Sequence, residues 1–156
     1  MAELTYRDAV ASAIAQEMER DENVVFLGED IGGAGGVFKA TVGLLERFGP
    51  TRVRDTPISE MAILGTCMGA AMTGLRPIAE IMFSDFLAVC WDIPANQMAK
   101  ARYMSGGQFT LPLVVRTANG GGLREYPGHL LEQSTRTVPQ QLVSGRHRLR
   151  PEPRRA

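Results

Sequence analysis

Short apolar runs alternate with amphipathic segments over the first 116 residues of the chain. NVVFLG, RPIAEIMF and LPLVVR are continuous enough to fill strands that are covered on both faces, and RVRDTP is a shorter candidate. The segments between them carry apolar residues at helical spacing, with Thr5, Ser59 and Ser84 as candidate caps. We therefore expect strands at 23–28, 52–57, 76–83 and 111–116, and helices at 5–21, 41–49, 59–73 and 84–104.

Each link between two consecutive expected strands contains a helix. This alternation indicates an α/β domain, a layered and mostly parallel sheet with helices on both faces. Ligands of such sheets bind at the carboxyl ends of the strands, where the loops EDIGGAGG, DTPISE, FSDF and TANGGG fall in this sequence. Pro94 should interrupt the last helix.

Composition excludes some classes of partner, and it differs between the first 122 residues and the rest of the chain. The formal net charge is zero, so charge gives no reason to expect a nucleic acid or a membrane as partner. No signal peptide and no membrane-length apolar stretch is visible, and Cys67 and Cys90 lack CxxC spacing, so we expect a cytoplasmic protein with buried free thiols. Residues 1–122 carry 10 Lys+Arg and 14 Asp+Glu, whereas 123–156 carry 7 Arg and 3 Glu. We expect 123–156 to be a poorly ordered, Arg- and Pro-rich tail.

One carboxylate, Glu60, heads the otherwise small and apolar segment TPISEMAILGTCMGAAMTG. An acid in the first turn of a helix is ordinary helix-start chemistry, favoured by the helix dipole by about 0.3–1 kcal/mol. Gly65 and Gly69 lie four residues apart, so we also expect another backbone to pack closely here and to hold Glu60 in a partly dry place. A carboxylate in such a place binds a proton more readily and can hydrogen-bond to a heterocyclic nitrogen.

Other candidate residues admit both a structural and a ligand-binding interpretation. Glu29 and Asp30 follow a strand at the ligand edge, but solvated loop acids would look the same. The glycines after them form neither G-x-G-x-x-G nor G-x-x-x-x-G-K-[ST], so we do not expect nucleotide binding by these devices. Phe86 fits a core position as well as a ligand platform. The histidines, His129 and His147, lie in the patternless tail, and no His/Cys spacing indicates a metal site.

Five segments together resemble the β subunit of the thiamine diphosphate-dependent, decarboxylating component of 2-oxo acid dehydrogenases. This family comprises components of the pyruvate, branched-chain and acetoin dehydrogenase complexes. The resemblance covers residues 1 to about 122 and implies a transketolase-like, pyrimidine-binding domain there. The segments are LGED (27–30), RVRDTPISE (52–60), GAAMTGLRPIAEIMFSDF (69–86), NQMAKARYMSGG (96–107) and LPLVVRTANGGG (111–122).

The resemblance implies roles for individual residues. Glu60 would be the catalytic residue, because the family's matching glutamate shares a proton with N1′ of the aminopyrimidine ring of the cofactor. Glu29 would lie near the active site, and Phe86 would stack on the pyrimidine. Ile58 and Met82 would line the same pocket.

The resemblance also implies a partner chain. In this family a separate α subunit with a GDG…N motif holds the cofactor's diphosphate and Mg²⁺, and this chain contains no Gly-Asp pair. We expect an α2β2 assembly that decarboxylates a pyruvate-like 2-oxo acid, or cleaves acetoin, and passes the acyl group to a lipoyl acyltransferase component. The backbone carbonyl of Leu113 would be one ligand of a structural monovalent cation.

The sequence departs from the family pattern after residue 122. The family carries there a catalytic histidine in a motif like GAQHSQ and then a second domain, whereas this chain reads LREYPGHLLEQSTR, and we assign no role to His129. Either a shifted reading frame or a genuinely divergent end explains the change, and the second domain would be missing. We expect the isolated chain to be inactive. The alternatives to an enzyme subunit are a truncated, inactive fragment that keeps subunit-interaction surfaces, and a stand-alone small-molecule-binding domain.

Overall fold

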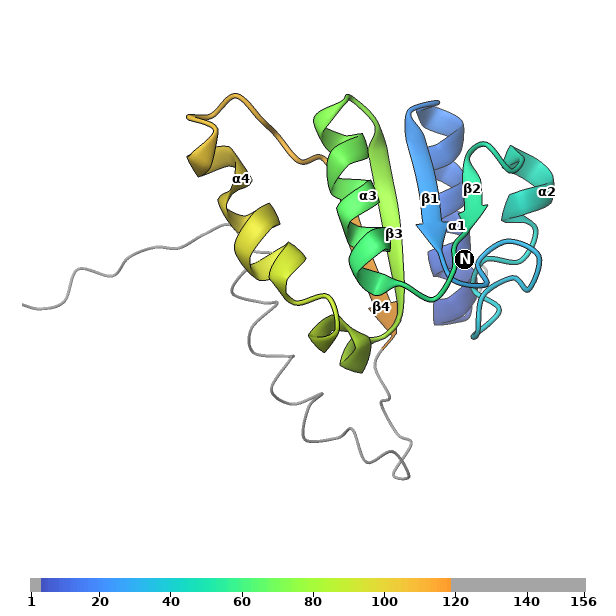
Figure 1. Ribbon diagram of the computed structural model, residues 1–156. Coiled ribbons are helices and arrows are strands. Elements are labelled where there is room, and N and C mark those ends of the chain that lie inside the picture. Colours follow the sequence, from blue (N-terminus) through green and yellow to red (C-terminus); the bar gives the residue numbers. More distant parts are fainter. Residues whose placement is uncertain (1–3, 119–156) are drawn as a thin grey trace, which may run out of the picture.

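The computed structural model describes residues 4–118, and their elements alternate between helix and strand (Figure 1). The predicted tail, 123–156, with His129 and His147, lies outside the described residues. The first six elements are α1 (Tyr6–Arg20), β1 (Val24–Gly28), α2 (Leu44–Phe48), β2 (Val53–Asp55), α3 (Glu60–Met72) and β3 (Arg76–Phe83). After them come a 3₁₀ turn η1 (Ser84–Ala88), a π-helical turn η2 (Ile93–Met98), α4 (Ala99–Met104) and β4 (Val114–Ala118).

The described strands form one sheet in the order β2-β1-β3-β4, and each neighbouring pair is parallel. Phe26 at the centre of β1 pairs with Val53 on one side and with Ile78 on the other. The strands therefore all end at the same edge of the sheet, which confirms the predicted parallel α/β architecture. We call this end, formed by the residues that follow β1, β2 and β3, the carboxyl edge; the opposite end is the amino edge.

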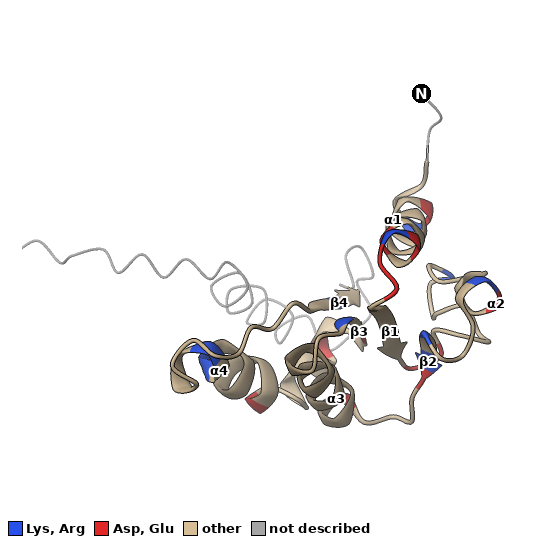
Figure 2. Ribbon diagram, turned by 90° about the horizontal axis from the view of Figure 1, so that it is seen from above, with Lys and Arg blue, Asp and Glu red and all other residues tan. Residues whose placement is uncertain are grey.

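Helices cover both faces of the sheet, as expected. Seen from above, α1 lies on one side of the strands, and α3 and α4 lie on the other (Figure 2). Two apolar clusters match these layers: one joins α1 to β1 around Met18 and Phe26, and the other joins α3 to β3 around Leu64 and Ile81. Because Val24 and Phe26 alternate with Val25 and Leu27 along β1, the strand contributes to both layers.

The start of α1 is confirmed in detail. Thr5 is its N-cap, and the Asp8 amide donates a 3.2 Å hydrogen bond to the Thr5 hydroxyl oxygen. The hydroxyl in turn donates to the Asp8 carboxylate at 2.6 Å. The Thr5 side chain thus satisfies one of the free amides at the helix start, as an N-cap does.

Within 84–104, the interruption predicted at Pro94 is confirmed, but the expected helical start at Ser84 is wrong. This segment divides into η1, η2 and α4, and Phe83 rather than Ser84 occupies the N-cap of η1. Pro94 lies in the first turn of η2, where its missing amide and its ring disfavour regular α-helical hydrogen bonds. A π-helical turn therefore leads into α4, which has no buried residue.

Both cysteines are free and buried, as expected from their apolar surroundings. Burial raises the pKa of the Cys67 thiol to about 11. Burial also raises the pKa of Cys90 to about 11, and the charge of Glu60 adds to that shift. Within 4–118, no helix has the length and apolar character needed to cross a bilayer.

Candidate functional site

Glu60 is the first residue of α3, and only 7% of it is exposed. The buried positions of this helix are 60, 63, 64, 67 and 71, the spacing of a single stripe along an α-helix. The apolar members of the stripe pack in the cluster that α3 shares with β3. Glu60 is therefore buried because it continues the sheet-facing stripe of α3 into the first turn.

The predicted close approach at the glycines is wrong for the described part of the chain. A Cβ added at Gly65 or Gly69 would meet no atom within 4 Å, so that side of α3 is open. Packing on the sheet, rather than a neighbouring backbone at the glycines, keeps Glu60 dry. The predicted outcome, a carboxylate sheltered from solvent, holds for a different physical reason.

The Glu60 carboxylate has unused capacity to accept hydrogen bonds. No hydrogen bond or salt bridge joins it to another side chain or amide between residues 4 and 118. Its oxygens are not among the fully buried atoms that lack a partner, so they stay within reach of a ligand. Ser59 occupies the N-cap as expected, but its side chain makes no capping hydrogen bond. The free amides and the dipole at this helix start favour negative charge there. The arrangement suits a ligand that brings a donor or a proton to the carboxylate.

Glu29 directly follows β1 and is a second buried carboxylate, 8% exposed. Burial raises its pKa above the usual range, and the negative charges of Glu60 and Asp30 raise it further, while the backbone of Ser59 acts in the opposite direction. The structure therefore brings Glu29 and Glu60 into electrostatic contact at the carboxyl edge. Glu29 holds a proton more readily than an ordinary glutamate does.

Three further polar atoms, which lie in or just after strands, are buried and have no hydrogen-bond partner among the described residues. They are Thr56 Oγ1 after β2, Asp85 Oδ1 after β3 and Thr117 Oγ1 in β4. Leaving such an atom unsatisfied costs about 1–3 kcal/mol, so each of these oxygens calls for a donor from a ligand or from further protein. Sequence reasoning missed all three, although DTPISE and FSDF did mark the loops that carry Thr56 and Asp85.

A third buried glutamate, Glu80, has its partner within the chain. It lies in β3 opposite Arg116 of β4, and the Arg116 guanidinium donates to its carboxylate. Burial raises the pKa of Glu80, and Arg116 opposes that shift. Gly28 on β1 leaves room for this side chain, because a Cβ there would lie 2.8 Å from the Glu80 Cβ. Glu80 is thus a structural carboxylate, unlike Glu60.

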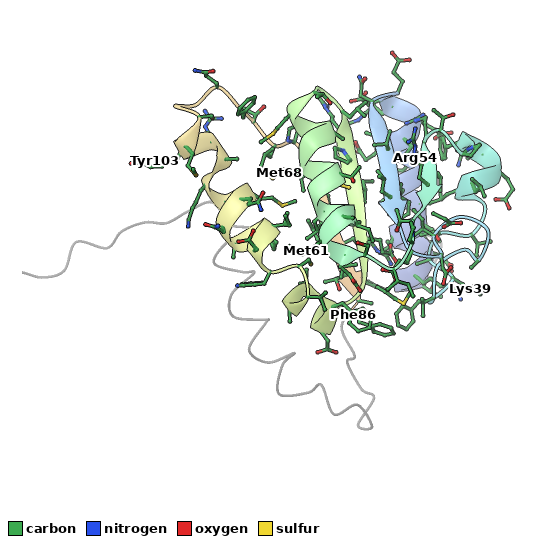
Figure 3. The ribbon with its side chains drawn as sticks, in the orientation of Figure 1. Lys39, Arg54, Met61, Met68, Phe86 and Tyr103 are labelled. Atoms are coloured by element: carbon green, nitrogen blue, oxygen red, sulfur yellow. The ribbon has the colours of Figure 1, made fainter. Side chains whose placement is uncertain are left out.

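The predicted apolar site residues differ in their exposure. Phe86 in η1 lies at the carboxyl edge, as does Met61 in the first turn of α3, which was not among the predicted residues (Figure 3). Met82 is half-buried near the end of β3. Ile58, on the loop into α3, is 85% exposed, so no part of the described chain covers it. Their roles toward a cofactor stay predictions.

The predicted cation ligand lies apart from these acids in the sequence. Leu113 is half-buried just before β4, and its amide donates a 2.9 Å hydrogen bond to the Leu111 carbonyl. In the part of the chain that the structure describes, no group of three or more His, Cys, Asp or Glu residues could hold a metal ion. The assignment of the Leu113 carbonyl stays a prediction.

The structure thus defines a parallel α/β domain in which two buried acids lie close together where the strands end. The sequence model of the family described as "Transketolase, pyrimidine binding domain" matches residues 2–140. The chain belongs to this family. A solved structure with a similar fold is the "Split gene transketolase, inactive beta4 tetramer", with a TM-score of 0.54 and 19% identity over 70% of this chain and 32% of that chain.

Curated relatives are more similar in sequence. The chain is 50% identical to 2-oxoisovalerate dehydrogenase subunit beta of Bacillus subtilis over 123 residues, 79% of this chain and 38% of the relative. It is 46% identical to acetoin:2,6-dichlorophenolindophenol oxidoreductase subunit beta of Bacillus subtilis, over 81% of this chain and 40% of the relative. It is 47% identical to pyruvate dehydrogenase E1 component subunit beta of Acholeplasma laidlawii, over 83% of this chain and 39% of the relative.

These similarities confirm the resemblance to β subunits of pyruvate, branched-chain and acetoin dehydrogenases. The chain spans about two fifths of the length of these relatives, between 38% and 40%. These similarities do not assign roles to single residues.

Proposed function

We propose that this chain is the pyrimidine-binding β subunit of a thiamine diphosphate-dependent 2-oxo acid dehydrogenase, with Glu60 as its catalytic residue. One observation carries the proposal: in a family of pyrimidine-binding domains, the first residue of α3 is a buried carboxylate that no described residue engages. An aminopyrimidine ring offers the nitrogen that such a carboxylate lacks. The orphaned oxygens of Thr56 and Asp85 also fit a bound polar group at this edge.

Thiamine diphosphate, when bound, supplies an electron sink that lets carbon dioxide leave a 2-oxo acid. Glu60 would hold the aminopyrimidine by sharing a proton with its N1′, and the low exposure of Glu60 would strengthen that contact. Glu29, with its raised pKa, takes up a proton readily and so limits charge repulsion against Glu60. Phe86 offers a ring face for stacking, and Met82 and Ile58 keep water from the pyrimidine.

The proposal includes an α subunit, in an α2β2 assembly, that holds the cofactor's diphosphate and Mg²⁺. The exposed Ile58 supports it, because a second chain at the carboxyl edge would cover this apolar side chain. The substrate is a pyruvate-like 2-oxo acid or acetoin, in keeping with the names of the relatives. A lipoyl acyltransferase component receives the acyl group, and the Leu113 carbonyl contributes to a monovalent-cation site.

A second candidate function is an inactive fragment that keeps only subunit contacts. The open side of α3 at Gly65 and Gly69, where a Cβ would meet no described atom within 4 Å, favours this alternative, because another chain could pack there. It predicts binding to an α subunit with no turnover of any 2-oxo acid. The leading proposal predicts turnover once the α subunit is present and none without it.

The test compares two buried glutamates in the full chain combined with an α subunit. Glu60→Gln should lower turnover of the 2-oxo acid by about 10²–10⁴-fold, because an amide cannot hold the shared proton. Glu80→Gln is the matched control, since Glu80 is similarly buried but is paired with Arg116. Its turnover per folded molecule should equal that of the wild type. Activity that survives Glu60→Gln would disprove the catalytic role of Glu60.

A further inference from the structure

We propose that Phe38 and Phe83 are positioning residues that fix the ring plane of Phe86, and so set how a pyrimidine stacks on it. The inference rests on the proposed function for its ligand, but the ring arrangement itself is a feature of this chain. Phe38 comes from the loop between β1 and α2, Phe83 is the last residue of β3, and Phe86 lies in η1.

The three rings form a series of edge-to-face contacts. The centroids of Phe38 and Phe83 are 5.7 Å apart with an interplanar angle of 80°. Those of Phe83 and Phe86 are 5.5 Å apart with an angle of 81°. Both values fall in the range that aromatic rings prefer, in which the positive edge of one ring meets the negative face of the next. The orientation of each ring therefore restricts the next one.

Phe86 needs such a restraint because η1, the turn that carries it, does little to fix the plane of its ring. η1 has only five residues, and Phe86 is 36% exposed. The second side-chain torsion of a phenylalanine has a broad energy profile, so an exposed ring samples many planes. Phe83 is anchored at the end of β3, which lies inside the sheet between β1 and β4. It is thus a fixed neighbour against which the Phe86 ring can align.

The loop that carries Phe38 is held by β2, which lies on the other side of β1 from β3. Asp55, the last residue of β2, accepts hydrogen bonds from the amides of Gly32 at 2.7 Å and Gly33 at 3.2 Å. The buried Thr41 hydroxyl donates to the Ile31 carbonyl at 2.7 Å, which closes the loop at its other end. Phe38 therefore extends from a braced loop, and its ring is a second support for the series.

Stacking on a heterocycle depends on the plane of the protein ring, so a loosened Phe86 should bind the pyrimidine more weakly. Each aromatic pair contributes about 0.5–1.5 kcal/mol, which corresponds to about a threefold to tenfold change in affinity. We expect Phe38→Leu to produce a loss of this size without any contact between Phe38 and the cofactor.

The first experiment reads the ring directly and needs no cofactor. The full chain is made with 4-fluorophenylalanine at position 86, and its ¹⁹F spectrum is compared in Phe38→Leu and in Val37→Ala. Val37 is the matched control, because it is the preceding residue and is 44% exposed, as Phe38 is. We expect Phe38→Leu to shift the ¹⁹F resonance, Val37→Ala to leave it in place, and Phe38→Tyr to restore it. An unchanged resonance in Phe38→Leu would overturn the inference.

The second experiment measures the affinity for thiamine diphosphate of the full chain combined with an α subunit. Phe86→Leu and Phe38→Leu should both weaken binding, and Val37→Ala should not. If Phe86→Leu binds as tightly as the wild type, the proposed cofactor site is wrong. If Phe86→Leu weakens binding but Phe38→Leu does not, the site stands and the positioning roles of Phe38 and Phe83 are wrong.

Discussion

The two ends of the sheet differ in whether their polar groups have partners within the chain. At the amino edge, charged side chains find partners within the chain. At the carboxyl edge, the Glu60 carboxylate and the buried oxygens Thr56 Oγ1 and Asp85 Oδ1 have no hydrogen-bond partner among the described residues. At one end of the sheet the chain itself supplies the hydrogen-bond partners. At the other end, some polar groups have room for partners from a ligand or another subunit.

Arg52 shows how the amino edge is completed. Its guanidinium donates to the carbonyls of Met18 at 2.7 Å, of Asp21 at 2.8 Å and of Val24 at 2.8 Å. It also lies over the Phe48 ring, 5.4 Å from the centroid. One side chain thus connects the end of α1, the start of β1 and the end of α2.

Glu60 shows the contrast. It is as well buried as a core residue, yet no described side chain or amide donates a hydrogen bond to its carboxylate. Most buried polar groups in proteins have such a partner. Partnered polar groups thus mark the parts of this domain that hold it together, and Glu60 marks the part that we assign to ligand and subunit binding.

The largest effect on stability is expected at the amino edge. Arg52→Ala should lower the free energy of unfolding by about 2–3 kcal/mol, because it removes charge-assisted hydrogen bonds to three carbonyls. Arg54→Ala on the same strand is the control, since Arg54 is exposed and bonds only to Thr51 nearby in sequence (Figure 3). Urea unfolding measures both. Equal losses in the two variants would show that the amino edge does not depend on Arg52.

The next effect concerns the buried pair between β3 and β4. Arg116→Met should lower the free energy of unfolding at pH 7 by about 1–3 kcal/mol, because Glu80 is left buried without its counter-charge. Without Arg116 the native-state pKa of Glu80 rises further above its ordinary value. The penalty is therefore present above the unfolded pKa and absent below it.

Unfolding of Arg116→Met should accordingly approach that of the wild type as the pH falls below about 4. Arg102→Met, on the exposed surface of α4, is the control and should show no such pH dependence. A deficit that stays constant between pH 7 and pH 3.5 would mean that Arg116 contributes by packing alone.

A smaller change of opposite sign is expected at Glu29. Its pKa is raised in the folded state, so the wild type loses stability as the pH rises from the unfolded pKa to the folded one. Glu29→Gln avoids this loss and should unfold at a slightly higher urea concentration at pH 7, with no difference at pH 3.5. A variant that is less stable at neutral pH would show that the hydrogen bond from the Ser59 backbone to the Glu29 carboxylate outweighs burial and the repulsion from Glu60.

Hydrophobic pattern was enough to predict most of the fold, because apolar runs and helical spacing directly reflect burial. It predicted β3 at its true bounds, and it located the carboxyl edge through the loops EDIGGAGG, DTPISE and FSDF. Residue type added Thr5 as the cap of α1 and Pro94 as the interruption of the last helix. The separate 3₁₀ turn η1 before that interruption was missed, because its residues have helical spacing.

The sequence was enough to predict which residues form the candidate site, but not which of them interact with each other. Glu29 and Glu60 stand out in the sequence, but their mutual repulsion depends on how close β1 ends to the start of α3. The cause of Glu60 burial was predicted wrongly, because small residues at 65 and 69 resemble a contact face whether or not anything covers them. The orphaned oxygens of Thr56 and Asp85 became visible only when the neighbours of each atom were known.

The most direct test of the contrast between the two edges is the free energy of unfolding of Glu60→Gln at pH 7. If Glu60 is kept for a ligand and has no structural partner, the variant should be as stable as the wild type to within about 0.5 kcal/mol, or more stable, since it relieves repulsion against Glu29. A loss of more than about 1 kcal/mol would show that the Glu60 carboxylate holds the fold together, and the account of the carboxyl edge would be wrong.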